Sequence, residues 1–209
     1  MKLEDRILYA DMLECRRKKG KIYYEDSHGL LIESPKSHML YCAAENEASA
    51  KAVVAHLPSS FAILVAHDMY TDRFIQQQYH ITCELRCYHS AYIEKTLPQV
   101  KLPHGFTMQT LTEAYIPEII ALYKHSMPSL ATVEYIKECL NDDMFAVFDK
   151  EILCGFIGVH EEESIGLLEV KQEYQRKGIA TALLQRAVQS QMLKGRIPYG
   201  EIVEDNIIS

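Results

Sequence analysis

Residues 165–180 read IGLLEVKQEYQRKGIA, a short apolar stretch followed by a polar turn that contains Gly178. After the turn, apolar residues recur at the spacing of one helix face, at Ile179, Leu183, Leu184, Ala187 and Val188. Gly195 predicts the end of that helix. The pattern therefore predicts a strand, a tight glycine turn and an amphipathic helix.

The glycine turn has the properties of an anion-binding site. Gly178 lets a ligand approach the backbone closely. The first amides of the helix have no acceptor within it, and the helix dipole favours negative charge there, which predicts a site for a phosphate or pyrophosphate. G-x-G-x-x-G is lacking and Lys177 precedes the glycine, which excludes a dinucleotide fingerprint and a P-loop. Residues 175–180 alone are also compatible with a plain strand-to-helix connection.

The order of residues resembles a known signature. Gln-x-x-Gly-x-Ala at 175–180, after a strand that ends at Val170, is similar to the acetyl-CoA signature of the GCN5-related N-acetyltransferase (GNAT) superfamily. Residues 197–206, IPYGEIVEDN, resemble the next strand and its trailing Asn in the FR47-like branch, which includes the glycine N-acyltransferases. The resemblance covers roughly residues 105–209 and is strongest from residue 155 onward.

The resemblance implies the donor and how it is held. The donor is acetyl-CoA, without a metal; the strand pairs with its pantetheine arm and the amides of the turn hold its pyrophosphate. The expected cofactor-binding residues are Leu168, Glu169, Val170, Gln175, Arg176, Lys177, Gly178, Ile179, Ala180, Thr181 and Asn206. Arg176 and Lys177 can equally be solvated cations at a helix start.

The resemblance also implies an N-acetyltransferase, in which a primary amine attacks the thioester directly. This reaction needs a held thioester, a deprotonated amine and a stabilised oxyanion. The strand positions that carry His or Glu in several relatives fall on Ser164 and Gly166, which cannot act as bases. The candidate bases are Glu163, which can equally lie in a solvated acidic turn, and Glu169, which can equally be a polar partner in the fold. A water-relayed base, or an amine that arrives neutral, is also open.

A general acid is not expected in this sequence. In many relatives a tyrosine about two helical turns beyond the strand that ends at Asn206 protonates the departing thiolate, and this sequence ends at Ser209. A truncated or unusually short protein is expected. His160 is interpreted as structural.

The alternative functions are a noncatalytic acyl-CoA-binding or regulatory protein, and a scaffold whose first half binds a partner.

Composition narrows the class of protein. The 209 residues are 48% hydrophobic and 24% charged, as in a globular protein, and the net charge of −7 argues against nucleic-acid binding. The longest apolar run, 61–66, is too short to span a membrane, and the N-terminus has no signal-peptide core. The six cysteines lack metal-site spacing, which predicts reduced thiols and a cytoplasmic protein. An amine-bearing small molecule or peptide is the expected acceptor, and a homodimer is compatible with the sequence.

Two domains are expected, separated by a segment with two prolines and a glycine at 96–105. Residues 1–98 are predicted to form a smaller α/β domain of unknown role, with helices over 6–18, 46–56 and 69–78 and strands over 21–24, 29–33, 38–42, 61–65 and within 81–93. Residues 104–209 are predicted to form the acyl-CoA-binding domain, with a strand over 106–110, helices over 112–125 and 133–140, and strands over 145–148, 152–159 and 164–170. Thr112 and Thr132 are the expected N-caps of the two helices. The resemblance implies a mixed α/β (α+β) fold whose mostly antiparallel sheet is flanked by helices, without its last helix and strands.

Overall fold

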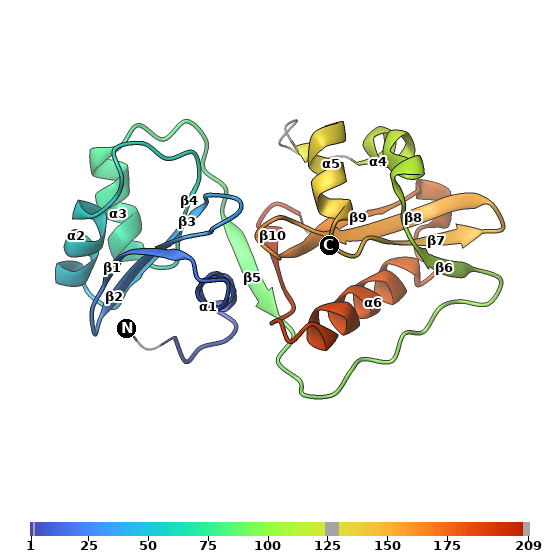
Figure 1. Ribbon diagram of the computed structural model, residues 1–209, viewed down its shortest axis with the longest axis horizontal. Coiled ribbons are helices and arrows are strands. Elements are labelled where there is room, and N and C mark those ends of the chain that lie inside the picture. Colours follow the sequence, from blue (N-terminus) through green and yellow to red (C-terminus); the bar gives the residue numbers. More distant parts are fainter. Residues whose placement is uncertain (2, 124–129, 207–209) are drawn as a thin grey trace. The chain divides into compact units, whose positions relative to one another are not determined.

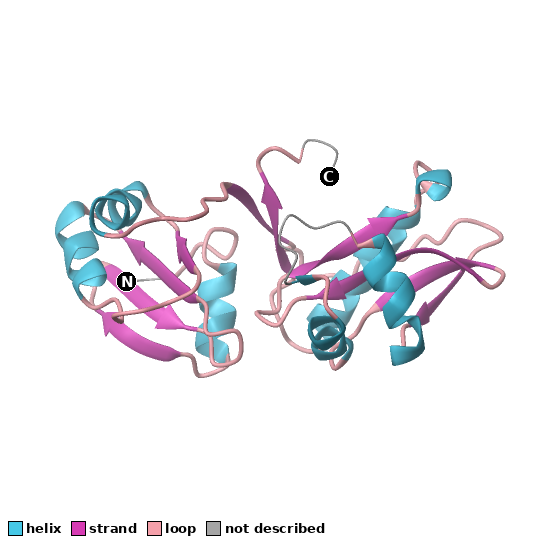
Figure 2. Cartoon of the chain, turned by 90° about the horizontal axis from the view of Figure 1, so that it is seen from above, coloured by secondary structure: helices cyan, strands magenta, loops and turns pink. Residues whose placement is uncertain are grey.

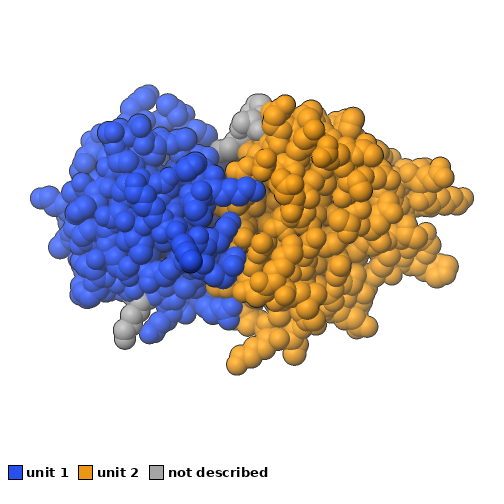
Figure 3. Space-filling view, in the orientation of Figure 1, with its two compact units in different colours: residues 1–91, 201–209 blue, residues 92–200 orange. Residues whose placement is uncertain are grey.

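The computed structural model describes residues 1, 3–123 and 130–206. They form two compact units, which Figure 3 shows in blue and orange. The first unit comprises Met1–Ala91 together with Glu201–Ser209, and the second comprises Tyr92–Gly200. The chain therefore leaves the first unit before the segment 96–105 and returns to it near its end.

The first unit contains a four-stranded sheet in the order β1-β2-β3-β4, in which only the β3–β4 pair is parallel (Figures 1 and 2). Its strands are β1 (Lys21–Glu25), β2 (Gly29–Glu33), β3 (Leu40–Ala44) and β4 (Leu64–Ala66), and its helices are α1 (Ala10–Arg17), α2 (Glu47–Ala55) and α3 (Met69–Gln78). A two-stranded sheet pairs β5 (Cys87–Ala91) with β10 (Tyr199–Val203).

Both faces of this sheet are covered, because alternate residues of the central strands point to opposite sides. Leu30 and Ile32 pack with Met12 of α1, whereas Leu31 packs with Val53 of α2. This two-sided burial explains why β2 and β3 are almost continuously apolar.

Four predictions for the first unit are wrong in extent. The strand expected over 38–42 is β3, which begins and ends two residues later. The helix expected from residue 6 begins at Ala10, because the Asp5 carboxylate accepts hydrogen bonds from the amides of Ile7 and Leu8 and holds a turn there. The strand expected over 61–65 is the short, half-exposed edge strand β4. Within 81–93, only β5 is a strand.

The second unit has the antiparallel sheet order β6-β7-β8-β9, with α4 and α5 on one face and α6 on the other (Figure 1). Its strands are β6 (Thr107–Thr110), β7 (Phe145–Asp149), β8 (Ile152–Val159) and β9 (Ile165–Val170), and its helices are η1 (Glu113–Tyr115), α4 (Ile116–Leu122), α5 (Val133–Leu140), η3 (Gln172–Tyr174) and α6 (Ile179–Leu193). The predicted mixed α/β fold with a mostly antiparallel sheet flanked by helices is confirmed.

Of the two helix caps predicted in the second unit, the structure shows one. Thr132 caps α5, since its hydroxyl oxygen accepts a hydrogen bond from the amide of Tyr135 at 3.2 Å, as predicted. Thr112 was predicted to cap a helix over 112–125, but η1 intervenes and, within the described residues, its side chain makes no capping hydrogen bond. Residues 124 and 125 of that prediction lie outside the described residues.

The structure also bears on the cysteines and on membrane-spanning segments. All six cysteines are free thiols, and four of them are buried. No helix among the described residues is both long and apolar enough to cross a membrane.

Candidate functional site

β9 is the last strand of its sheet, so one of its edges is not paired within the sheet. At its first residue the start of β10 comes close, since a Cβ on Gly200 would lie 2.8 Å from the carbonyl oxygen of Ile165. β10 itself pairs with β5 and not with β9. An exposed strand edge of this kind can pair with an extended ligand.

A bulge interrupts β9 in its middle. Phe156 pairs with Glu169 and Gly158 with Gly166, so one residue of β8 faces two residues of β9. Leu167 has a left-handed backbone, with φ of 52°. The Leu167 side chain is 2% exposed, whereas that of the next residue, Leu168, is 39% exposed. The bulge therefore changes the direction of backbone groups at the centre of the strand.

The turn after β9 delivers the chain to the start of α6. The side-chain amide of Gln175 donates a hydrogen bond to the carbonyl oxygen of Val170 at 3.1 Å, which ties the turn to the end of the strand. Arg176 and Gly178 both have left-handed backbones, with φ of 61° and 83°. A Cβ on Gly178 would meet only Pro103 Cγ, at 3.6 Å, so backbone strain rather than lack of space favours glycine.

Among the described α-helices, α1, α4 and α6 begin without a side-chain cap, and of these three only α6 begins at a left-handed glycine. Side chains of Asn46, Asp68 and Thr132 cap α2, α3 and α5. Among the described residues, no side chain caps α6, which is the longest described helix. The amides of its first turn are therefore available to an external acceptor, with the positive end of the helix dipole behind them.

Cations lie beside this helix start. Arg176 and Lys177 are exposed, and the Lys177 ammonium lies 4.9 Å from the centre of the Tyr174 ring. Lys171 instead contacts the Glu118 carboxylate at 2.9 Å. Two of the three basic side chains thus place exposed positive charge in the turn that leads into α6.

The two carboxylates predicted as bases lie in different surroundings. Glu163 is buried in the β8–β9 turn, and its carboxylate lies 3.3 Å from the guanidinium of Arg196. Glu169 is half-buried in β9, and its charge contributes, after burial and Cys139, to the raised pKa of Tyr123. The carboxylate of Glu163 is therefore paired with the Arg196 side chain, whereas Glu169 lies near the end of α4.

His160 lies at the end of β8, in a position that sequence reasoning interpreted as structural. Its Nδ1 lies 2.6 Å from the hydroxyl oxygen of Tyr135 in α5. A Cβ on Gly166 would lie only 2.3 Å from Nε2 of His160, so the imidazole occupies the space that a side chain of β9 would fill. The glycine inside an apolar strand was the sequence signal for this close approach.

A surface hollow of about 440 Å³ adjoins this pair. We call it the acidic hollow, since its lining has three carboxylates and one ammonium: Thr132, Glu134, Tyr135, Lys137, Glu138 and Glu161. Lys137 lies 3.3 Å from the Glu113 carboxylate. Burial, then Cys139 and Glu162, raises the pKa of Tyr135, which keeps its hydroxyl protonated. The acidic hollow thus suits a cationic group next to Tyr135 and the His160 that it contacts.

Comparison with known proteins assigns this fold. Residues 112–198 match the family model described as an acetyltransferase (GNAT) domain. The second unit has a GNAT fold. A search of curated proteins found no match to the chain.

Solved structures resemble the chain beyond the GNAT domain. A GCN5-related N-acetyltransferase from Kribbella flavida is 10% identical over 100% of this chain and 88% of its own, with a TM-score of 0.57. One from Sphaerobacter thermophilus is 16% identical over 93% and 76%, with a TM-score of 0.52. A Drosophila protein is 13% identical over 85% and 71%, with a TM-score of 0.62. Identities this low show the fold and leave the reaction to be argued from residues.

Most predicted cofactor residues fall on two adjoining parts of the GNAT domain. Leu168, Glu169 and Val170 lie on β9, and the series Gln175, Arg176, Lys177, Gly178, Ile179, Ala180 and Thr181 forms the turn and the first turn of α6. Asn206 belongs to the first unit, where its amide donates to the carbonyl oxygen of Val203 at 2.8 Å. Its role toward a cofactor stays a prediction.

Proposed function

We propose that the protein is an N-acetyltransferase that transfers an acetyl group from acetyl-CoA to a primary amine by direct attack. The observation that carries the proposal is the uncapped start of α6 behind left-handed Gly178, directly after the strand edge of β9. GNAT acetyltransferases use acetyl-CoA as their acyl donor. The resemblance of 197–206 to the FR47-like branch adds glycine N-acyltransferase-like chemistry to the candidates.

The donor would bind along β9 and at the turn. The pantetheine arm carries amides and can pair with the strand edge at Leu168 and Val170 in the manner of an added strand. The pyrophosphate would accept hydrogen bonds from the first amides of α6, where the helix dipole contributes up to about 2 kcal/mol. Arg176 and Lys177 would add screened attraction from the surface.

The base would be His160, with Tyr135 as the residue that orients it. An imidazole is the side chain best suited to exchange protons near neutral pH. In the tautomer whose Nδ1–H donates to the Tyr135 hydroxyl oxygen, Nε2 is left with a lone pair beside Gly166. Glu163 is a weaker candidate, because its contact with Arg196 favours the carboxylate form. Glu169 stays the second candidate.

The reaction then follows from these positions. The amine nitrogen gives a proton to Nε2 of His160, directly or through one water, and forms a bond to the thioester carbon. A backbone amide of the bulge at Leu167 and Leu168 would donate to the oxyanion. The C–S bond breaks as the carbonyl re-forms, and the CoA thiolate leaves and takes up a proton. The acidic hollow would hold the positively charged part of a small-molecule or peptide amine.

A noncatalytic acyl-CoA-binding protein is the second candidate function. It is favoured by the ion pair of Glu163 with Arg196, which engages one of the two predicted bases. In both candidate functions acyl-CoA binds at the turn before α6, and the difference is whether the acyl group is then transferred to an amine.

The test is to incubate the full chain with acetyl-CoA and a panel of primary amines and short peptides, and to follow the release of free thiol. We expect amine-dependent release that saturates with acetyl-CoA. Saturable acetyl-CoA binding without thiol release across the panel would support the noncatalytic protein. Absence of acetyl-CoA binding would contradict both.

A further inference from the structure

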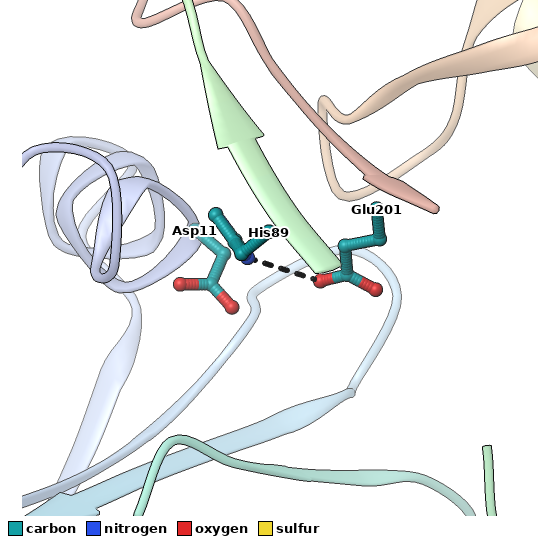
Figure 4. A group of neighbouring side chains, drawn as sticks. All are labelled: Asp11, His89 and Glu201. Atoms are coloured by element: carbon teal, nitrogen blue, oxygen red, sulfur yellow. Dashed lines mark ion pairs between the residues drawn. The ribbon is translucent and has the colours of Figure 1, made fainter. Parts of the chain in front are cut away.

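A second group of chemically active side chains lies in the first unit and plays no part in the proposed transfer. Asp11 comes from α1, His89 from β5 and Glu201 from β10 (Figure 4). One ligand atom of each lies within 4.8 Å of those of the other two. Three segments far apart in sequence thus present two carboxylates and an imidazole to one point.

The β5–β10 pairing brings His89 and Glu201 together. The amide of Glu204 donates to the carbonyl oxygen of Arg86, and the amide of Tyr92 donates to that of Pro198. His89 is three residues from both Arg86 and Tyr92, and Glu201 is three residues from both Glu204 and Pro198. The two residues are therefore directly opposite each other on antiparallel strands, where side chains share a face.

The distance between these two side chains is informative. His89 Nδ1 lies 3.8 Å from Glu201 Oε1, which is longer than a hydrogen bond. Two ligands on one tetrahedral ion, with bonds of about 2.1 Å, are about 3.4 Å apart. The separation is thus close to that of two ligands of a shared metal.

Asp11 is held in place from behind. Its side chain is fully buried; Oδ1 accepts a hydrogen bond from the amide of Met12 at 2.7 Å, and Oδ2 lies 2.9 Å from Nε2 of His67. A carboxylate oxygen has two lone pairs, so each can accept a hydrogen bond and still bind a cation. Such outer contacts orient carboxylate ligands in metal sites.

The charges also favour a cation. Two carboxylates and a neutral imidazole carry a charge of −2, and the neighbouring His67, which contacts Asp11, can offset at most one of these charges. A mixed set of one nitrogen and two oxygen ligands suits divalent transition metals, Zn²⁺ among them. Glu201 is the most accessible of the three, with a side chain 30% exposed, and gives an ion a route to the site.

We propose that Asp11, His89 and Glu201 bind a divalent transition-metal ion such as Zn²⁺, and that His67 positions Asp11. The ion joins α1 and β5 to the strand β10, which the chain reaches only after it has formed the whole second unit. The site thereby secures the returning end of the chain to the first unit.

The test uses the full chain after treatment with a chelator, titrated with Zn²⁺ alone against a chromophoric competitor. We expect one equivalent to bind and the melting temperature to rise. Glu201→Gln and His89→Gln should weaken binding by more than about 100-fold, because loss of an outer contact alone costs about 10- to 100-fold. Matched controls are His28→Gln and Glu45→Gln, because these residues form a His–Glu pair at 2.8 Å elsewhere on the surface of the first unit. They should bind as the wild type does.

Two further variants keep the result interpretable. The titration is repeated with Cys83→Ser and Cys87→Ser together, since both thiols are exposed; loss of binding there would overturn the proposal, because thiolates would then be the ligands. With Co²⁺ as a spectroscopic substitute, His67→Gln should retain one equivalent but change the visible absorption spectrum. Absence of binding by the wild type, or equal binding by Glu201→Gln and Glu45→Gln, would also overturn it. Glu201→Gln is the main variant, because its partly exposed side chain leaves the core intact.

Discussion

Gly178 and Gly195 stand at opposite ends of α6, and both have left-handed backbones, with φ of 83° and 70°. A β-branched side chain at either position strains the backbone by a similar amount. Only the first position faces the uncapped amides of the helix start. The two glycines therefore separate an effect on ligand binding from an effect on stability.

We expect Gly178→Val to weaken acetyl-CoA binding at least about tenfold, or 1.4 kcal/mol. The matched control, Gly195→Val, should lower stability by a similar amount and leave affinity unchanged. Calorimetric titration with acetyl-CoA measures the affinity and thermal melting measures the stability. Unchanged affinity in Gly178→Val would contradict the assignment of the pyrophosphate site.

His160 gives the second prediction at this scale. His160→Gln should lower kcat about 10²- to 10⁴-fold, as for loss of a general base, with little change in acetyl-CoA affinity. Tyr135→Phe keeps the ring and should lower kcat less, while it alters the pH dependence of kcat/KM. The readouts are steady-state kinetics across pH and donor affinity. A larger loss in Glu169→Gln than in His160→Gln would assign the base to Glu169.

The sequence could predict the glycines but not the histidine, for a physical reason. Gly178 and Gly195 act through their own backbone, so their roles follow from local pattern. His160 acquires its surroundings from Tyr135 on another element and from the space above Gly166. The gap left by Gly166 was visible in the sequence, but the group that fills it depends on how the strands pair.

At the scale of elements, an ion-pair cluster joins the C-terminal end of α6 to the loop between α5 and β7. Lys194 and Arg196 both contact the Asp142 carboxylate, and Arg196 extends the cluster to Glu163. Burial raises the pKa of Asp142, but hydrogen bonds from Lys194 and Arg196 outweigh it and lower the pKa to about 2 from an ordinary 3.8. The cluster therefore stabilises the charged form.

The sign of the pH dependence follows from this lowered pKa. The stability that the ionised Asp142 carboxylate gives to the folded state is present above a pH of about 4 and is lost as the pH falls through about 2. Asp142→Asn should thus lower the free energy of unfolding by about 1–2 kcal/mol at pH 7, discounted for partial exposure, and the difference should shrink toward pH 2. Urea unfolding of both proteins at several pH values measures it. Glu151→Gln, at an exposed turn, is the control, and a pH-independent difference would contradict the explanation.

Elements with strong local signals were predicted well. The bounds of α3, α5, β2 and β8 agree with those expected from apolar spacing and caps. The segment 81–93 was not, because its residues carry β propensity but only Cys87–Ala91 find a partner strand, and that partner is β10 from the end of the chain. The proposed metal ligands Asp11, His89 and Glu201 were not predicted either, because they come together only through long-range strand pairing. None of them has a neighbour in sequence at metal-site spacing. The prediction that no metal is bound rested on local spacing alone.

At the scale of the whole molecule, the β5–β10 pairing gives a testable consequence for cleavage. Residues 94–96 are exposed and lie at the beginning of the second unit, just after the chain leaves the first. A protease site inserted there should be cut in the native protein, and the two fragments should remain associated through β5 and β10. Size-exclusion chromatography with and without denaturant measures this. Ile202→Pro removes a backbone donor from β10 and should weaken the association of the fragments. If the fragments without this substitution separated in the absence of denaturant, the β5–β10 pairing would be contradicted.

The chain crosses between its units twice, at 91–92 and again at 200–201. In sequence, the second unit is therefore inserted within the first and does not follow it as a separate tandem domain. An exchange of the second unit with that of another protein would therefore need two junctions, near Tyr92 and Gly200, instead of a single junction at the prolines. A graft joined only at 96–105 would leave the host without its last strand.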